Sequence, residues 1–108
     1  MAVKRYELKD KVAVVTGAGS GIGRALAQLL ARKGCRLALA DINEASLKET
    51  AQELPAEVIT RKLDVARRDD VYAFAAEVTK HYGTANVVIN NAGVAVSQTV
   101  NDLSWEDF

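Results

Sequence analysis

Hydrophobic residues along the chain fall into four short apolar runs, and longer amphipathic stretches separate these runs. Parallel strands joined by crossover helices produce this alternation, because each buried strand is followed by a helix that covers it. The runs lie at residues 12–15, 37–40, 57–63 and 86–90. We therefore predict an α/β protein in which these four runs are the strands of a parallel sheet.

The runs differ in how apolar they are, and this difference predicts their places in the sheet. Residues 12–15 are continuously apolar, which is typical of a central strand covered by helices on both faces. Residues 57–63 instead alternate, with Arg61 between Ile59 and Leu63. One face of this strand should therefore be wetter, and we place the strand at an edge of the sheet.

Three helices are predicted between the strands. Apolar residues recur at helical spacing within residues 22–30, 47–54 and 71–82. The third stretch shows one apolar face made of Val71, Phe74, Ala75, Val78 and Tyr82. Asn43 can cap the second helix, while Gly34 and Gly83 follow the first and third helices, where glycine often ends a helix. Ser104 indicates the start of a further helix.

Composition limits the kinds of protein that the chain can be. Its 108 residues suffice for one domain, which we take to span residues 1–108. With 49% hydrophobic and 26% charged residues, disorder throughout is excluded. Fourteen basic and fourteen acidic residues give zero net charge, so binding to nucleic acid or to an anionic membrane is not expected. The uncharged stretch 84–101 is too polar to cross a membrane.

Cys35 is the one cysteine in the sequence. An internal disulfide, a cysteine-based zinc site and a C-x-x-C redox pair are therefore excluded, and no metal site is expected. The amino terminus becomes charged again before an apolar segment of signal-peptide length develops. These features favour a reducing, cytoplasmic location. We interpret Cys35 as a small buried side chain, and His81 as a helix-end residue rather than a catalytic group.

The strongest local motif is a glycine turn that connects the first strand to the first helix. It reads Thr16-Gly17-Ala18-Gly19-Ser20-Gly21-Ile22-Gly23. Glycines permit positive φ and close approach of a ligand to the backbone, and free N–H groups at a helix start attract a pyrophosphate. The chain has no P-loop motif, and Ile22 occupies the third glycine position of the common G-x-G-x-x-G pattern. A glycine turn can also be purely structural, so the motif alone leaves both interpretations open.

Asp41 supports the ligand-binding interpretation. It follows the second strand at the distance from the glycine turn where a carboxylate can hydrogen-bond a ribose 2′-hydroxyl. The same carboxylate would repel a 2′-phosphate, so the sequence favours NAD over NADP, with NADP still possible. Arg24 or Lys33 could weaken this preference if either lies near the site. The alternative role for Asp41 is to cap the next helix together with Asn43.

With two further motifs, the chain resembles the short-chain dehydrogenase/reductase family. The family has T-G-x-x-x-G-x-G after the first strand, an aspartate followed by a hydrophobic residue after the third, and N-N-A-G after the fourth. Here these are Thr16 to Gly23, Asp64-Val65 and Asn90-Asn91-Ala92-Gly93. The resemblance implies a Rossmann-like doubly wound parallel sheet, whose first four strands lie in the order 3-2-1-4 with crossover helices.

The resemblance also implies roles for individual residues. The Asp64 carboxylate and the next backbone N–H would contact the adenine, Asn91, Ala92 and Gly93 would lie near a cofactor ribose, and Thr16 would brace the strand ends. Asp64 could instead cap a helix, and the two asparagines could form an ordinary turn. The candidate cofactor-binding residues are Gly17, Ser20, Gly21, Ile22, Gly23, Asp41, Ile42, Asp64, Val65, Asn91, Ala92 and Gly93.

Catalytic residues are not assigned. The family transfers hydride between carbon and nicotinamide with a Tyr-x-x-x-Lys pair, a serine and usually an asparagine, all after the fourth strand. Tyr6, Tyr72 and Tyr82 have no lysine four positions later. The chain is therefore expected to supply the cofactor-binding half of an oxidoreductase and to have no turnover by itself. The whole protein is expected to act on a small alcohol or ketone, with residues 94–98 near the substrate, and to form a homo-oligomer.

Two other functions fit the same residues. The chain could be a non-catalytic dinucleotide-binding module, or a degraded gene product that kept the cofactor half and lost turnover. A scaffold that binds no dinucleotide is disfavoured, because three cofactor motifs occur together.

Overall fold

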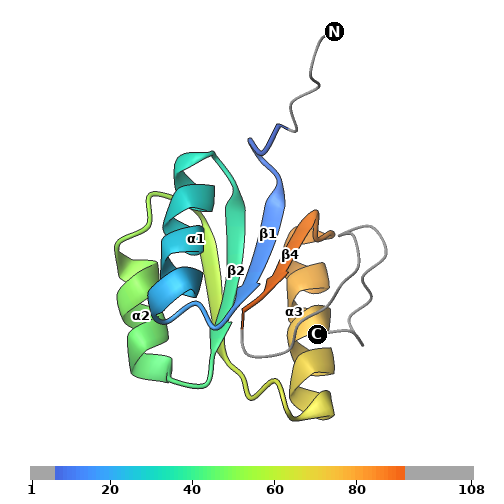
Figure 1. Ribbon diagram of the computed structural model, residues 1–108. Helices are drawn as coiled ribbons and strands as arrows, with labels where there is room; N and C mark the ends of the chain where they lie inside the picture. Colours follow the sequence, from blue (N-terminus) through green and yellow to red (C-terminus); the bar gives the residue numbers. More distant parts are fainter. Residues whose placement is uncertain (1–6, 92–108) are drawn as a thin grey trace, which may run out of the picture.

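The computed structural model describes residues 7–91, which form one parallel sheet with helices on both faces (Figure 1). The elements follow one another as β1 (Val12–Thr16), α1 (Gly21–Arg32), β2 (Arg36–Asp41), α2 (Glu44–Gln52), β3 (Val58–Lys62), α3 (Arg68–Tyr82) and β4 (Val87–Asn90). The strands lie in the order β3-β2-β1-β4, as expected for the first four strands of a doubly wound sheet. Ala92, Gly93 and the helix predicted from Ser104 lie outside the described residues.

β1 is the central strand that its apolar sequence predicts. It pairs in parallel with β2 on one side and with β4 on the other. All five of its residues are fully buried, because helices cover both faces. The carboxyl end of β1, where the glycine turn begins, is therefore fixed by sheet hydrogen bonds from both sides.

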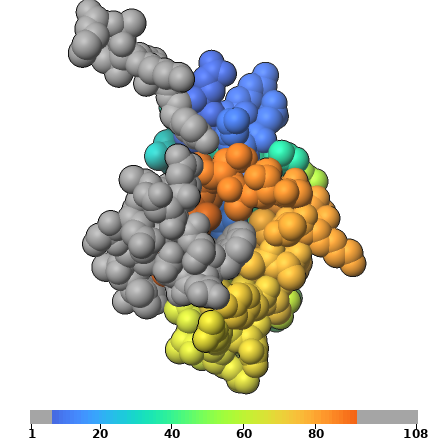
Figure 2. Space-filling view, turned by 90° about the vertical axis from the view of Figure 1, so that its right-hand side faces the viewer, coloured from blue at the N-terminus to red at the C-terminus, as the bar shows by residue number. Residues whose placement is uncertain are grey.

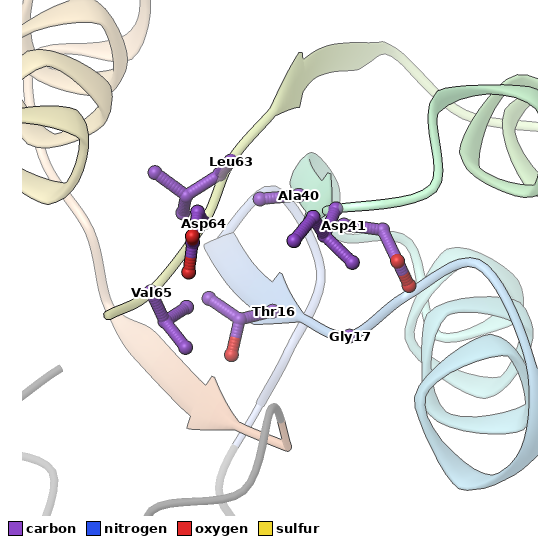
Figure 3. Close-up of a pocket in the computed structure, with 8 residues that line it drawn as sticks. Thr16, Gly17, Ala40, Asp41, Leu63, Asp64 and Val65 are labelled. Carbon is purple, nitrogen blue, oxygen red and sulfur yellow. The ribbon is translucent and has the colours of Figure 1, made fainter. Parts of the chain in front are cut away.

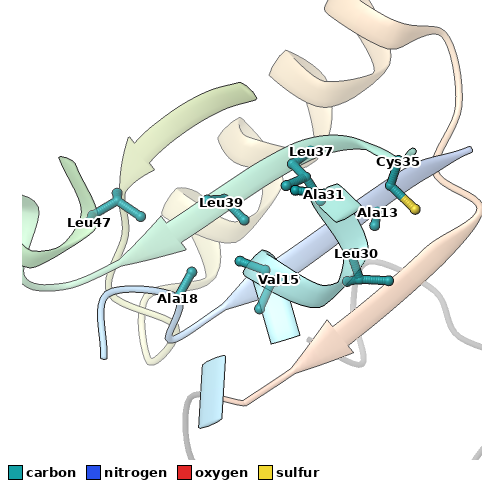
Figure 4. Close-up of a cluster of buried hydrophobic side chains, with 10 residues drawn as sticks. Ala13, Val15, Ala18, Leu30, Ala31, Cys35, Leu37, Leu39 and Leu47 are labelled. Atoms are coloured by element: carbon teal, nitrogen blue, oxygen red, sulfur yellow. The ribbon is translucent and has the colours of Figure 1, made fainter. Parts of the chain in front are cut away.

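Two apolar cores lie on opposite faces of the sheet. On the α1 and α2 side, Ala13 and Val15 of β1 and Leu37 and Leu39 of β2 pack with Leu47 of α2 (Figure 4). On the other face, the alternate strand residues pack against α3. These residues are Val12, Val14, Ala38 and Ala40 from the strands and Val71, Phe74 and Val78 from the helix. The period of two in each strand thus divides its side chains between two cores.

α1 buries Leu30 but leaves two of its other large apolar residues exposed. Ile22 and Leu29 are 70% and 42% exposed. The buried residues are Gly23, Ala27, Leu30 and Ala31. Small residues face the sheet here because the helix packs very close to the preceding turn: a Cβ on Gly23 would lie 2.0 Å from the Gly17 carbonyl oxygen.

The remaining elements agree with the sequence pattern. β3 is the edge strand, and its residues are half-buried or exposed. The five apolar residues predicted for the inner face of α3 are the ones that it buries. Asn43 caps α2 by accepting a hydrogen bond from the Ser46 N–H at 3.0 Å. Gly34 and Gly83 follow α1 and α3 with φ of 90° and 79°, values that suit glycine.

Candidate functional site

The carboxyl ends of β1, β2 and β3 open into one cavity of about 290 Å³. Each strand end supplies two or three of its lining residues, and Figure 3 shows their side chains around a shared space. The lining residues are Thr16, Gly17, Ala40, Asp41, Ile42, Leu63, Asp64 and Val65. The sequence predicts five of these as cofactor-binding residues, and the fold brings them together from three separate segments.

The glycine turn enters α1 with its backbone unobstructed. Gly17 and Gly21 have φ of 65° and 56°, in the left-handed region that glycine adopts at low cost. Among residues 7–91, a Cβ added to Gly21 would meet no atom within 4 Å outside its chain neighbours and its own helix backbone. The backbone at Gly21 is therefore open to a bound group, which is what close approach of a phosphate requires.

The amino terminus of α1 differs electrostatically from the other helix starts that the structure describes. Asn43 caps α2 with its side chain, and α3 carries Asp69 and Asp70 in its first turn. α1 has neither feature, because Ser20 makes no side-chain capping bond and no acidic residue lies in its first turn. The partial positive charge of α1 is thus left for another anion, and this arrangement suits a pyrophosphate.

The Asp41 carboxylate is oriented by two backbone groups. Its Oδ2 accepts from the Gly19 N–H at 2.8 Å, and its Oδ1 accepts from the Asn43 N–H at 2.9 Å. An ionised carboxylate has about four acceptor positions, so each oxygen retains one for a further donor such as a ribose hydroxyl. Asp41 does not cap α2, because Asn43 takes that role. Asp41 contributes to this helix start only by holding the Asn43 N–H.

Asp64 and Val65 form the opposite wall of the cavity. The Asp64 Oδ1 accepts from the Ala66 N–H at 3.0 Å, which closes a tight turn after β3. Asp64 does not cap α3, since Arg67 occupies the N-cap position. In Figure 3 the Asp64 and Val65 side chains lie near Thr16, across the cavity from Asp41. A flat base could lie between these two walls.

The ends of β1 and β4 are joined by a polar bridge. Thr16 is fully buried, and its hydroxyl donates to the Asn90 Oδ1 at 2.9 Å and accepts from the Asn91 N–H at 3.1 Å. The Asn91 side-chain amide reaches the Gly17 carbonyl at 3.4 Å. The two asparagines thus hold the glycine turn in place. Ala92 and Gly93, which complete this motif, lie outside the described residues.

The two basic residues considered near the site behave differently from the sequence expectation. Lys33 follows the last residue of α1, about 18 Å along the helix from Gly21. Arg24 turns instead toward α2, where its Nε donates to the Thr50 hydroxyl at 2.8 Å. Lys33 therefore lies at the far end of α1 from the glycine turn, while the Arg24 guanidinium contacts α2 and the Gly19 carbonyl of the turn.

Sequence reasoning placed Gly19 in the glycine turn and considered Arg24 near the site, but it missed Thr50 and the contacts that join the three residues. Gly19, Arg24 and Thr50 meet there, although Thr50 lies on a different helix from Arg24. The one available signal is Thr50 itself, a polar residue on the inner side of an amphipathic helix, one residue before Ala51. A buried hydroxyl requires a hydrogen-bond partner, so such a residue indicates a specific contact.

Cys35 and Tyr82, two side chains with reactive groups, lie in buried positions. Cys35 is buried, and burial raises the pKa of its thiol. The Tyr82 hydroxyl donates to the Leu37 carbonyl at 2.8 Å. Within residues 7–91, no group of three or more His, Cys, Asp or Glu side chains could hold a metal ion. None of the helices in this part of the chain is both apolar enough and long enough to span a bilayer.

Comparison with known proteins identifies the family. The family model for short chain dehydrogenases matches residues 11–108. The chain is 49% identical over 92% of its length to SadH, an inferred oxidoreductase of Mycobacterium tuberculosis. It is 38% identical over 95% of its length to an NAD-dependent glycerol dehydrogenase of Listeria innocua. The chain therefore belongs to the short-chain dehydrogenase/reductase family of oxidoreductases.

Solved structures agree with this assignment. A short-chain dehydrogenase/reductase from Burkholderia phymatum, determined in complex with NAD, superposes with a TM-score of 0.80 at 40% identity over 95% of this chain. The chain spans 37% of SadH, 41% of the glycerol dehydrogenase and 38% of the Burkholderia chain. The comparisons thus cover the glycine turn and the strand-end motifs found above, on less than half the length of each relative.

Proposed function

We propose that residues 1–108 form the dinucleotide-binding half of an NAD-dependent oxidoreductase. When bound, the nicotinamide supplies the hydride donor or acceptor, and the whole protein would interconvert a secondary alcohol and a ketone. The proposal extends to a small-molecule substrate, a homo-oligomeric enzyme and a cytoplasmic location. The cofactor named for the Listeria relative and the NAD in the Burkholderia structure support the choice of nucleotide.

The observation that carries the proposal is the environment of Asp41. Two backbone N–H groups fix its carboxylate at the mouth of the cavity, and each oxygen keeps an acceptor position. A ribose with free 2′- and 3′-hydroxyls can donate to these positions. A 2′-phosphate would instead bring negative charge against the carboxylate, so NAD should bind more tightly than NADP, with NADP as the weaker ligand.

The other proposed contacts follow from position. The backbone of Gly17, Ser20, Gly21, Ile22 and Gly23 would hold the pyrophosphate at the start of α1. Asp64 and Val65 would contact the adenine, with Ile42 covering its other side. Ile42 is 61% exposed, which leaves its apolar surface available for such a contact. Asn91 would lie near a ribose, and we extend the same role to Ala92 and Gly93 from the family motif.

The test is titration of the full chain with NAD and NADP by calorimetry, beside Asp41→Ala and Asp41→Asn. We expect NAD to bind more tightly than NADP, and both variants to weaken NAD by about tenfold or more, because hydrogen bonds to a charged group are worth about 1.5 to 3 kcal/mol. NADP affinity should stay level or rise in the variants. A folded protein that binds neither nucleotide, or Asp41 variants with unchanged preference, would overturn the proposal.

A further inference from the structure

Arg24 connects three segments around the glycine turn. It lies in the first turn of α1, yet its side chain leaves this helix and reaches α2. The Nη2 atom donates to the Gly19 carbonyl at 2.6 Å and to the Ser46 carbonyl at 3.2 Å, and the Nε atom donates to the Thr50 hydroxyl at 2.8 Å. The rigid Arg24 guanidinium therefore donates to three acceptors, one in the glycine turn and two in α2.

Thr50 acts on the adjacent peptide. It is fully buried, and its hydroxyl donates to the Ala18 carbonyl at 2.9 Å while it accepts from Arg24. Two consecutive carbonyls of the glycine turn, Ala18 and Gly19, are thus each held by one member of this pair. The fit is close, because a Cβ on Gly19 would lie 2.8 Å from the Asp41 Oδ2 and 2.9 Å from the Ser46 Cβ.

Holding a carbonyl also fixes the N–H of the same peptide unit, because the peptide is planar and trans. The Ala18 carbonyl belongs to the unit that carries the Gly19 N–H, and this N–H donates to Asp41 at 2.8 Å. The Gly19 carbonyl belongs to the unit that carries the Ser20 N–H, at the amino terminus of α1. Thr50 therefore orients the donor that holds Asp41, and Arg24 supports this contact by donating to the Thr50 hydroxyl. Arg24 also orients a donor at the expected pyrophosphate position.

We propose that Arg24 and Thr50 are positioning residues that set nucleotide selectivity, by fixing the glycine turn and through it the Asp41 carboxylate. This inference rests on the proposed function, since it requires that Asp41 contact the ribose of NAD. Arg24 is then not a receptor for a 2′-phosphate. Its guanidinium is committed to α2 and the turn, and the nearby carboxylate of Glu49 lies 3.6 Å from its Nη1.

The experiment uses substitutions that distinguish the effect of hydrogen-bond geometry from the effect of positive charge. Thr50→Val removes the hydroxyl with little change in shape, and Thr50→Ser restores the hydroxyl. Arg24→Lys keeps the positive charge but replaces the planar fork by a single ammonium group. Glu49→Gln is the matched control, because Glu49 is 65% exposed and its ion pair should contribute little. Dissociation constants for NAD and NADP are measured on each folded full-chain variant by calorimetry, well below its unfolding temperature.

We expect Thr50→Val and Arg24→Lys each to weaken NAD by about five- to tenfold, the loss of one hydrogen bond that positions a ligand group. The ratio of the NADP to the NAD dissociation constant should fall in both variants. Thr50→Ser and Glu49→Gln should stay within about twofold of the parent protein. The double variant that combines Thr50→Val with Arg24→Lys should bind NAD no more weakly than the worse of the two single variants. The losses should not add, because the two residues act through one another.

Three outcomes would overturn the inference. An unchanged NADP-to-NAD ratio in a less stable Thr50→Val protein would show a purely structural role. Retained affinity in Arg24→Lys would show that charge alone matters, and additive losses in the double variant would show independent action. Failure of the proposed function looks different, because the parent protein itself would then bind no nucleotide, or Asp41→Ala would leave the preference unchanged.

Discussion

Gly21 and Gly23 lie two positions apart in the glycine turn, but Gly23 is closely packed and Gly21 has open space beside it. A Cβ on Gly23 would lie 2.0 Å from the Gly17 carbonyl oxygen and 2.8 Å from the Asn91 side-chain nitrogen. Gly23→Ala must therefore push α1 away from the turn, and we expect it to lower the free energy of unfolding by about 3 kcal/mol or more.

Gly21→Ala is the matched comparison. In the part of the chain that the structure describes, no packed neighbour lies within 4 Å of the new methyl group. The stability cost should therefore be the strain of φ at 56° in a non-glycine residue, about 1 kcal/mol. Gly21→Ala should nevertheless abolish measurable NAD binding, because the methyl group projects where the pyrophosphate is proposed to lie. Urea unfolding and NAD calorimetry on both variants check this, and equal stability losses would contradict it.

Thr16 gives a prediction for the bridge between β1 and β4. Thr16→Val keeps the shape of the side chain but removes the oxygen that bonds Asn90 and Asn91. We expect the free energy of unfolding to fall by about 2 kcal/mol, because two partly buried polar groups each lose this hydrogen bond. Thr16→Ser should recover most of this loss in thermal or urea unfolding. If the valine variant is as stable as the parent protein, the bridge contributes nothing.

Single residues were predictable from the sequence where a motif fixes a backbone requirement. Asp41 and Asp64 were found because they follow strands, and parallel strands bring their carboxyl ends to one edge. The contact between Arg24 and Thr50 was not found, since these residues are 26 positions apart and no periodic pattern relates a polar pair on two helices. Its geometry depends on how α1 and α2 pack.

At the scale of elements, α3 is fixed to the amino ends of the strands by Tyr82. The hydroxyl donates to the Leu37 carbonyl at 2.8 Å and lies 3.2 Å from the Glu57 carbonyl. Burial, together with the negative charge of Glu57, raises the pKa of Tyr82 to about 12. The neutral phenol is therefore the form that the fold stabilises.

This shift predicts a loss of stability at alkaline pH. Above pH 10, the usual pKa of tyrosine, the unfolded chain releases the phenolic proton while the folded protein keeps it until about pH 12. The free energy of unfolding should therefore fall between pH 10 and 12, by on the order of 2 kcal/mol from this group, and be unaffected by it below pH 10.

Tyr82→Phe isolates the contribution of the Tyr82 hydroxyl to the free energy of unfolding. At neutral pH the variant should be less stable by about 1 to 2 kcal/mol, because the Leu37 carbonyl loses its donor. Between pH 10 and 12 its stability should fall less steeply than that of the parent protein, so the difference between the two narrows. Urea unfolding at a series of pH values measures this. A constant difference across the range would show that Tyr82 titrates normally.

Elements were predictable to the extent that packing follows hydrophobicity. The alternation around Arg61 predicted the edge position of β3, and the apolar face of α3 is the face that the helix buries. α1 departs from this rule, since it buries Gly23 and Ala27 while Ile22 and Leu29 are exposed. A helix that packs close to a turn needs small residues on that side. A pattern based on hydrophobicity alone does not predict this requirement.

At the scale of the whole molecule, the candidate site lies at one end of the sheet, and the buried Tyr82 and Cys35 lie at the other. The glycine turn, Asp41 and Asp64 meet at the carboxyl ends of the strands, where the cavity lies. At the amino ends, Tyr82 and Cys35 fill buried positions instead. Polar contacts hold the strands together at both ends, since the Thr16 bridge lies beside the candidate site and the Tyr82 hydrogen bond lies at the amino ends.

The final prediction concerns β4. Among the described strands it pairs only with β1, and its four residues are half-buried. Figure 2 shows the orange residues of β4 beside α3 on the surface of the molecule. Because strand edges pair readily with other chains and the net charge of zero provides little repulsion, a polypeptide of these 108 residues should self-associate as its concentration rises.

Sedimentation velocity over a wide range of concentration measures this association, and hydrogen exchange locates it. The amides of β1, which has neighbours on both sides, should exchange most slowly at every concentration. Those of β4 should exchange fast in dilute solution and slow down as the polypeptide associates, because a second copy then covers the edge. A polypeptide that stays monomeric at high concentration, with β4 as protected as β1, would show that the edge of β4 is covered within one chain.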